Sequence, residues 1–265
     1  MSDLAINGKT WTDADHDLVV GDYFVMLDKT MRGLAVDPAT HQRALRFVTG
    51  RSGGAITFLQ GELSAALSLI GLPTLKDHPP RWDIGEGLVE AIDRYLTARP
   101  SVLKDLTQPP LLLGRVAAPV LAEGAPVAPP PVAIQGRLAE LVARFDPALR
   151  DQDARILARI GVAAALAYEQ ERLVKRGRSD LADLVRLALP PVEGCDLLSF
   201  SRTGEPRHVA VKATTGGPST PFALTPEETA LSQAQPDAFQ VYRLYDLARE
   251  ARVFRVRAAR QVLPA

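Results

Sequence analysis

Two ionisable side chains on neighbouring extended segments carry the strongest chemical signal in the sequence. Asp196 lies in the run CDLLSF, and Lys212 lies in the run RHVAVKA, after a turn at SRTGEP. Side chains alternate between the two faces of a strand, so Lys212 and Ala210 share one face if Val209 and Val211 point into a core. A carboxylate and a lysine on paired strands form the framework of a metal-dependent phosphodiesterase site.

Patterns for other catalytic chemistries are missing from the sequence. The four histidines show no ligand spacing, and the single cysteine, Cys195, argues against both a zinc site and an internal disulfide. The sequence contains no GxSxG nucleophile turn and no GxxxxGK or GxGxxG phosphate-binding pattern. It therefore favours neither Ser-His-Asp hydrolysis nor nucleotide-dependent chemistry.

The N-terminal part of the chain shows helical periodicity. Apolar residues recur at helical spacing, and the pattern predicts helices over 11–33 and 38–48, a third ending at Gly71, and a fourth over 84–96. The segment Ala55–Phe58 is an alternative site for a short strand. These elements predict a helical N-terminal domain over residues 1–98.

Prolines dominate the next part of the sequence. Residues 99–134 include the run PVAPPPV, which favours the extended polyproline II conformation and predicts a proline-rich linker. A second domain is then predicted over 135–265. It contains helices at 136–144, 151–176 and 226–234, a short helical segment after Ser179, and strands at 184–189, 196–200, 208–213, 239–246 and 252–257.

This order, α-β-β-β-α-β-β, resembles the restriction-endonuclease-like (PD-(D/E)XK) superfamily. Within it, the chain is most similar to the NO VEIN C-terminal domain-like family, over about 150–257. The matching motifs are Tyr168-Glu169 with Arg172-Leu173, GCDLLSF at 194–200, VAVKATTGG at 209–217, PFALTPEE at 221–228 and VYRLYDLAR at 241–249. The N-terminal pattern is similar to the helical region that precedes this domain in bacterial relatives. The resemblance implies an α/β fold class, with a helical N-terminal domain and a nuclease-like C-terminal domain.

The resemblance also implies a site. In the superfamily, an aspartate and the glutamate of an E-x-K element bind Mg²⁺, and the lysine assists the attacking water. Asp196 and Lys212 match the aspartate and the lysine, but Ala210 occupies the glutamate position. Glu169 and Glu228 are the candidates for a compensating acid, although Glu169 also suits pairing with nearby arginines and Glu228 suits a helix cap with Thr225.

Three functions remain open at this point. The first is a degenerate nuclease fold that binds nucleic acid or regulates a partner without hydrolysis, in which Lys212 pairs with Asp196 in a vestigial site. The second is an active Mg²⁺-dependent nuclease with a migrated glutamate, acting in defence or repair. The third is a non-catalytic module that binds a protein through its N-terminal helices. A carboxylate other than Asp196 within about 5 Å of the Lys212 amine, on the same face, would favour the active enzyme. Ala210→Glu is expected to increase metal affinity.

Charge and composition constrain the partners only weakly. The net charge is zero, but residues 135–265 hold 19 Lys and Arg against 16 Asp and Glu, or +3, which leaves −3 for residues 1–134. The candidates for contacts to the phosphates of DNA or RNA are Thr214, Thr215, Arg255 and Arg257. The polar, acidic N-terminus and the absence of a long apolar run predict a cytoplasmic protein that does not bind membranes.

Overall fold

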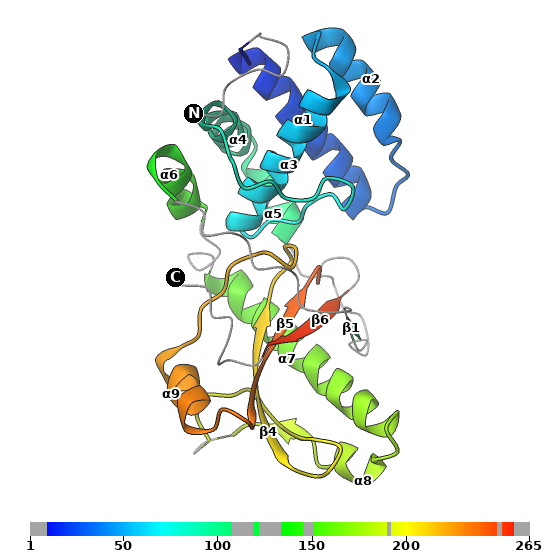
Figure 1. Ribbon diagram of the computed structural model, residues 1–265, viewed down its shortest axis with the longest axis vertical. Coiled ribbons are helices and arrows are strands. Elements are labelled where there is room, and N and C mark those ends of the chain that lie inside the picture. Colours follow the sequence, from blue (N-terminus) through cyan, green and yellow to red (C-terminus); the bar gives the residue numbers. More distant parts are fainter. Residues whose placement is uncertain are drawn as a thin grey trace. The chain divides into compact units, whose positions relative to one another are not determined.

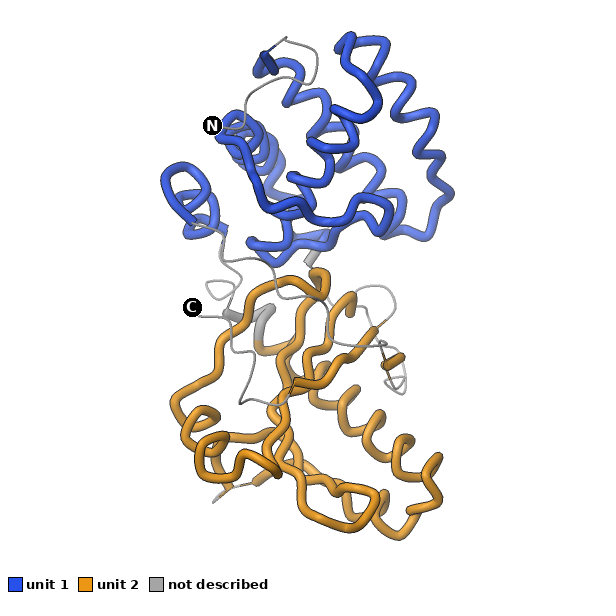
Figure 2. The backbone as a smooth tube through the Cα atoms, viewed as in Figure 1, with its two compact units in different colours: residues 1–108, 129–149 blue, residues 109–128, 150–265 orange. Residues whose placement is uncertain are grey.

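The computed structural model describes residues 10–107, 119–121, 134–145, 151–189, 192–247 and 251–256. The chain forms two compact units (Figure 2). Unit 1 contains residues 1–108 and 129–149, and unit 2 contains residues 109–128 and 150–265. The segment 136–144, which the sequence places at the start of the second domain, therefore belongs to unit 1.

Unit 1 is built from helices (Figure 1), and their buried side chains form one apolar core. They are α1 (Asp13–Met31), α2 (Pro38–Thr49), α3 (Gly53–Leu69), α4 (Glu86–Ala98), α5 (Pro100–Thr107) and α6 (Gly136–Arg144). Helix α3 is buried along most of its length, and α1 contributes the fully buried Tyr23. The Tyr23 hydroxyl forms a 2.7 Å hydrogen bond with Ser64 on α3 and accepts one from the Leu75 backbone N–H, so its burial leaves no polar atom unsatisfied.

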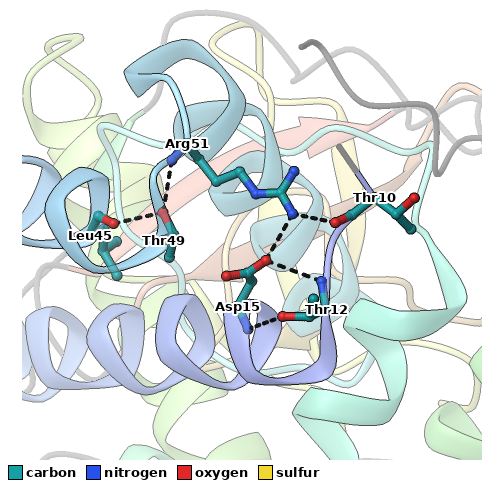
Figure 3. A network of polar contacts seen from close by, with 6 residues as sticks. All are labelled: Thr10, Thr12, Asp15, Leu45, Thr49 and Arg51. Atoms are coloured by element: carbon teal, nitrogen blue, oxygen red, sulfur yellow. Dashed lines mark hydrogen bonds and ion pairs between the residues drawn. The ribbon is translucent and has the colours of Figure 1, made fainter. Parts of the chain in front are cut away.

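A polar network fixes the start of α1 against the loop before α3 (Figure 3). Thr12 and Asp15 form the reciprocal capping box at the N-terminus of α1. The Arg51 guanidinium donates to Asp15 Oδ2 at 2.8 Å and to the carbonyl oxygen of Thr10, and its central carbon lies 4.5 Å from the centre of the Trp11 ring. One buried arginine thus joins the start of α1 to the loop before α3 through a charge-assisted bond and a cation–π contact.

One expectation for the N-terminal region is wrong. The alternative strand at Ala55–Phe58 is not formed, because Ala55, Ile56 and Leu59 belong to the buried side of α3. Helix α5 lies inside the segment predicted as a linker. Proline is tolerated in the first turn of a helix, where its missing N–H has no partner to lose, and Pro100 is the first residue of α5. Leu106 then anchors α5 to the core of unit 1.

Unit 2 contains a mixed sheet with helices on both faces (Figure 1). Its elements are β1 (Val120–Leu121), α7 (Asp151–Val174), α8 (Ser179–Ala182), β2 (Arg186–Leu187), β3 (Leu197–Phe200), β4 (Pro206–Ala213), α9 (Pro226–Ala234), β5 (Phe239–Tyr245) and β6 (Arg252–Val256). The strand order is β1-β6-β5-β4-β3-β2. The predicted order α-β-β-β-α-β-β is confirmed, and β1 adds a short parallel partner for β6 from within the predicted linker.

The two faces of the sheet have separate cores. On the α7 face, Val209 and Val211 of β4 pack with Tyr242 and Leu244 of β5. On the α9 face, Ala210 packs with Phe239 and Val241, beneath apolar residues of α9 and of the loop that precedes it. This alternation confirms that Ala210 and Lys212 share the face opposite α7.

Helix α7 approaches β4 closely at Gly161. A Cβ atom at this position would lie 2.5 Å from Cβ of Ala213, a separation that real Cβ atoms do not show. The glycine therefore sets how near α7 lies to the sheet. None of the helices in the described part of the chain is both long and apolar enough to span a bilayer.

Candidate functional site

Asp196 lies one residue before β3 and is tied to the sheet through its backbone. Its N–H donates to the carbonyl of Val209 at 2.8 Å, and its carbonyl accepts from the N–H of Ala188 at 2.8 Å. Its carboxylate Oδ2 also accepts a 2.6 Å hydrogen bond from the N–H of Val211. The carboxylate is therefore held beside β4, as the paired-strand prediction requires, while Oδ1 accepts no hydrogen bond from the described residues.

The pKa of Asp196 is raised above its ordinary value. Burial is the main cause, and the negative charge of Glu228 adds to it, whereas the Val211 N–H and the positive charge of Lys212 act in the opposite direction. Both Glu228 and Lys212 therefore lie near enough to influence the Asp196 carboxylate. A cation bound at this position would relieve the cost of burying two carboxylates together.

Lys212 pairs with Glu228 and not with Asp196. Its Nζ lies 2.6 Å from Oε2 of Glu228, and the two side chains are only 17% and 10% exposed. The predicted Lys212–Asp196 salt bridge is therefore wrong. The reason is positional, since Lys212 projects from the α9 face of β4, and the first turn of α9 brings Glu228 over that face. A carboxylate other than Asp196 thus lies well within about 5 Å of the lysine amine.

Glu228 has two roles in the fold. It is the third residue of α9, where its Oε2 accepts a 2.7 Å hydrogen bond from the N–H of Thr225 while its own N–H donates to Thr225 Oγ1 at 3.2 Å. The predicted capping box is confirmed. The second carboxylate oxygen, Oε1, accepts no hydrogen bond from the described residues. The cap therefore fixes the orientation of Glu228 and leaves one oxygen for another ligand.

Gly194 sets the spacing between Asp196 and α9, and sequence reasoning did not identify it. Its φ of 77° lies in the left-handed region, and a Cβ atom there would lie 2.5 Å from the carbonyl oxygen of Glu227. A side chain at this position would push the first turn of α9 away from the start of β3. The only signal in the sequence is a glycine two residues before Asp196, which alone does not specify a close approach.

Ala210 fills the position where the E-x-K glutamate is expected. It is 0% exposed and belongs to the apolar cluster formed with Phe239 and Val241, packed against Phe222 and Leu224. No space for a longer side chain remains on this part of the strand. The acid beside Lys212 is therefore supplied by α9 and not by β4.

Glu169, the other candidate acid, belongs to a separate buried network on the α7 face. Its two carboxylate oxygens accept hydrogen bonds from Nε and Nη2 of Arg172 at 2.7 and 2.8 Å, from Ser199 at 2.5 Å and from Tyr242 at 2.6 Å. Burial raises its pKa, but these donors outweigh burial and leave the pKa below its ordinary value. A carboxylate with four strong donors and no exposed surface is not available to a metal ion, so Glu169 is structural.

The phosphate-contact candidates do not form one surface. Thr214 and Thr215 are buried after β4, and Thr214 Oγ1 accepts a 3.0 Å hydrogen bond from the N–H of Gly216, which stabilises the turn. Arg255 is the register partner of Tyr242, which places it on the α7 face, opposite to Lys212. Arg257 lies outside the described residues. Arg255 therefore does not extend the Asp196 site.

The donor set at this site suits a hard divalent cation. Asp196 and Glu228 each offer one carboxylate oxygen that is not used by the described residues. Among those residues, no group of three or more His, Cys, Asp and Glu side chains is placed to hold a metal ion. Mg²⁺ commonly binds through one or two carboxylates and completes its shell with water and substrate phosphates, so two carboxylates are sufficient for a substrate-assisted site.

Comparison with protein families gives one match in this chain. Residues 162–256 match the family described as "Protein NO VEIN, C-terminal". The matched region runs from within α7 to the last residue of β6, and it contains Asp196, Lys212, Glu228 and Ala210. The searches of curated proteins and of solved structures each returned no match. The predicted family is confirmed, and residues 162–256 form a NO VEIN C-terminal domain.

Proposed function

We propose that the NO VEIN C-terminal domain is a divalent-cation-dependent phosphodiesterase acting on nucleic acid, with its second acid supplied by α9. The observation that carries this proposal is the 2.6 Å contact between Lys212 Nζ and Glu228 Oε2, on the same sheet face as Asp196. It supplies the carboxylate that the sequence lacks at Ala210. It therefore favours the active enzyme with a migrated glutamate over the degenerate fold.

Each of the three side chains has a distinct role in this proposal. Asp196 and Glu228 would hold Mg²⁺ or Mn²⁺ through their unused oxygens, with the Val211 N–H and the α9 cap fixing the other oxygen of each. The bound cation would polarise the phosphate and lower the pKa of an attacking water. Lys212, released from its direct contact with Glu228, would donate to a phosphate oxygen or orient that water.

The substrate class rests on the fold resemblance and on the small positive balance of residues 135–265. A phosphodiester also supplies the oxygen ligands that a two-carboxylate magnesium site needs. Metal and substrate would therefore bind interdependently. Metal affinity is expected to rise when a polynucleotide is present.

The test is cleavage by the purified full chain. Labelled single-stranded and double-stranded DNA and RNA are incubated with Mg²⁺, Mn²⁺ or EDTA, and the products are resolved by size. Glu228→Gln retains an amide oxygen for the cap but loses the charge, whereas Glu227→Gln makes the same change on the exposed neighbour. Cleavage that needs the metal, is lost in Asp196→Asn and Glu228→Gln, and persists in Glu227→Gln supports the proposal. No cleavage of any of the four substrates contradicts it.

A second candidate function is nucleic-acid binding without hydrolysis. The observation that favours it is the buried Ala210, together with a Lys212 charge that Glu228 already neutralises. Here the wild-type chain would bind polynucleotides in a salt-dependent manner and cleave none of them. A chain that binds no polynucleotide even at low salt would instead indicate the protein-interaction module.

A further inference from the structure

A buried arginine lies beside the Asp196 site on the next strand of the sheet. Arg243 of β5 is the register partner of Lys212, so the two residues project from the same α9 face. Its side chain is 2% exposed, and its guanidinium carbon lies 5.1 Å from the centre of the Phe222 ring. One terminal nitrogen donates to the carbonyl oxygen of Thr220 at 2.9 Å.

Arg243 has no counter-charge among the described residues. No carboxylate there forms an ion pair with it, and its Nε has no hydrogen-bond partner. Thr220, whose carbonyl oxygen accepts a hydrogen bond from Arg243, also has a buried hydroxyl. This hydroxyl has no hydrogen-bond partner in the described part of the chain. Burial lowers the pKa of Arg243 to about 9, and no nearby charge offsets it.

This arrangement is costly for the fold alone. Buried arginines are normally paired with carboxylates, because a buried cation without a counter-ion loses its hydration and gains little in return. The Glu169–Arg172 pair on the other face of the same sheet shows the usual solution, with a bidentate carboxylate. Arg243 has no carboxylate partner among the described residues, and the Thr220 hydroxyl beside it has no hydrogen-bond partner there. Together they indicate a binding site for an anion that is not part of the chain.

We propose that Arg243 and Thr220 form a phosphate-binding subsite next to the Asp196–Lys212–Glu228 cluster. Nε of Arg243 and the hydroxyl of Thr220 would each donate a hydrogen bond to a phosphate oxygen. The ligand class is a phosphate oxyanion, and its assignment to a polynucleotide backbone rests on the proposed function. Such a subsite would hold a neighbouring phosphate while the reacting one lies at Asp196 and Glu228, and so fix the register of the strand.

The covering loop must move for the ligand to enter. Thr220 and Phe222 belong to the segment between β4 and α9, and they cover the guanidinium with a carbonyl oxygen and an aromatic ring. A phosphate would take over the hydrogen bond now made to the Thr220 carbonyl and displace the Phe222 ring. Because Phe222 is only partly buried, this rearrangement leaves the sheet intact.

The subsite can be tested without metal or cleavage. Thermal unfolding and isothermal titration calorimetry of the full chain are measured in EDTA with two probes, inorganic phosphate and the dinucleotide TpT, against sodium chloride at equal ionic strength. At about ten times the dissociation constant, saturable binding raises the unfolding temperature of the C-terminal unit by roughly 3 °C or more. Arg243→Met abolishes this rise and the heat of binding. The charge-matched control Arg202→Met, on the exposed turn at the far end of β4, retains both.

The unliganded variants separate a binding role from a structural one. If Arg243 is kept for a ligand, Arg243→Met unfolds at the same temperature as the wild type or higher, because an uncompensated buried charge is removed. A fall of more than about 5 °C would show that Arg243 supports the fold and would overturn the inference. A second variant, Arg243→Lys, retains the charge without the planar fork and is expected to weaken binding at least tenfold.

The two probes also identify the ligand. Tighter Arg243-dependent binding of TpT assigns the subsite to a polynucleotide backbone, and tighter binding of inorganic phosphate assigns it to a terminal or free phosphate. Equal responses of the wild type and Arg243→Met to both probes overturn the subsite. Arg243-dependent binding in a protein that cleaves nothing would support the subsite and contradict the proposed phosphodiesterase activity, so the two failures are distinguishable.

Discussion

Replacing Glu169 by glutamine removes the negative charge from the buried network that joins α7 to β3 and β5. The carboxylate is 0% exposed and accepts four hydrogen bonds from Arg172, Ser199 and Tyr242. The glutamine side chain places an NH₂ group where one Glu169 carboxylate oxygen now accepts hydrogen bonds. At least one of the present donors would therefore face another hydrogen-bond donor instead of an acceptor. It also leaves the Arg172 guanidinium, which is 5% exposed, without its counter-ion.

The expected cost follows from these contacts. Removing one partner of a buried, hydrogen-bonded ion pair lowers the free energy of unfolding by about 3–5 kcal/mol. Glu171→Gln is the matched control on the same helix. Glu171 pairs with Lys175 at 2.5 Å, but both side chains are largely exposed, so the expected loss is at most about 1 kcal/mol.

The dependence of stability on pH provides a second, independent test of whether the ionised Glu169 carboxylate stabilises the fold. Because the pKa of Glu169 is held below its ordinary value of 4.5, its contribution to stability is complete above that pH and is lost as the pH falls through the folded-state pKa. The difference between the wild type and Glu169→Gln should therefore be constant from neutral pH down to about 5 and shrink at lower pH.

The assay must report on unit 2 alone. Both tryptophans, Trp11 and Trp82, lie in unit 1, so tryptophan fluorescence does not follow the sheet. Hydrogen exchange of the amides of β4 and β5, measured by mass spectrometry, gives the opening free energy of the sheet directly. A loss in Glu169→Gln below about 1 kcal/mol, or one equal to that of Glu171→Gln, would refute the structural role of Glu169.

Three further substitutions test the packing. Gly161→Ala should lower the unfolding free energy of unit 2 by about 1–3 kcal/mol because of the clash with Ala213. Adding Ala213→Gly should restore most of this loss. If the double variant instead loses the sum of the two single-variant losses, the close approach of α7 to β4 is contradicted. Arg51→Lys should cost unit 1 about 1–2 kcal/mol in urea unfolding followed by tryptophan fluorescence, since lysine lacks the planar fork; an unchanged midpoint would refute this. Ala210→Glu, expected from the sequence to increase metal affinity, should instead destabilise unit 2 by about 3 kcal/mol, because Ala210 is fully enclosed; a gain in Mn²⁺ affinity in a stable variant would contradict this.

Local patterns in the sequence were sufficient for much of the fold. The capping box of Thr225 and Glu228 depends on residues three positions apart, and it is formed. The alternation around Lys212 correctly assigned Val209 and Val211 to one face of β4. These features are short-range, so the sequence carries them directly.

The features that escaped prediction depend on contacts between distant segments. Lys212 meets Glu228 only because the loop after β4 returns α9 over the sheet, and nothing local favours Glu228 over Asp196 as its partner. In the sequence Arg243 is indistinguishable from an ordinary polar strand residue, because its burial depends on the loop that carries Thr220 and Phe222. Gly194 requires knowledge of where the first turn of α9 passes. The family resemblance placed Asp196 and Lys212 on neighbouring segments of one sheet but could not supply these contacts.

Joint binding of a divalent cation by Asp196 and Glu228 can be measured by a Mn²⁺ titration of the full chain followed by electron paramagnetic resonance. We expect saturable binding by the wild type, strengthened by a short uncleavable phosphorothioate oligonucleotide. We also expect binding to be lost in Asp196→Asn, weakened at least tenfold in Glu228→Gln and unchanged in Glu227→Gln. Absence of saturable Mn²⁺ binding by the wild type, or equal affinity in all four proteins, would contradict joint binding.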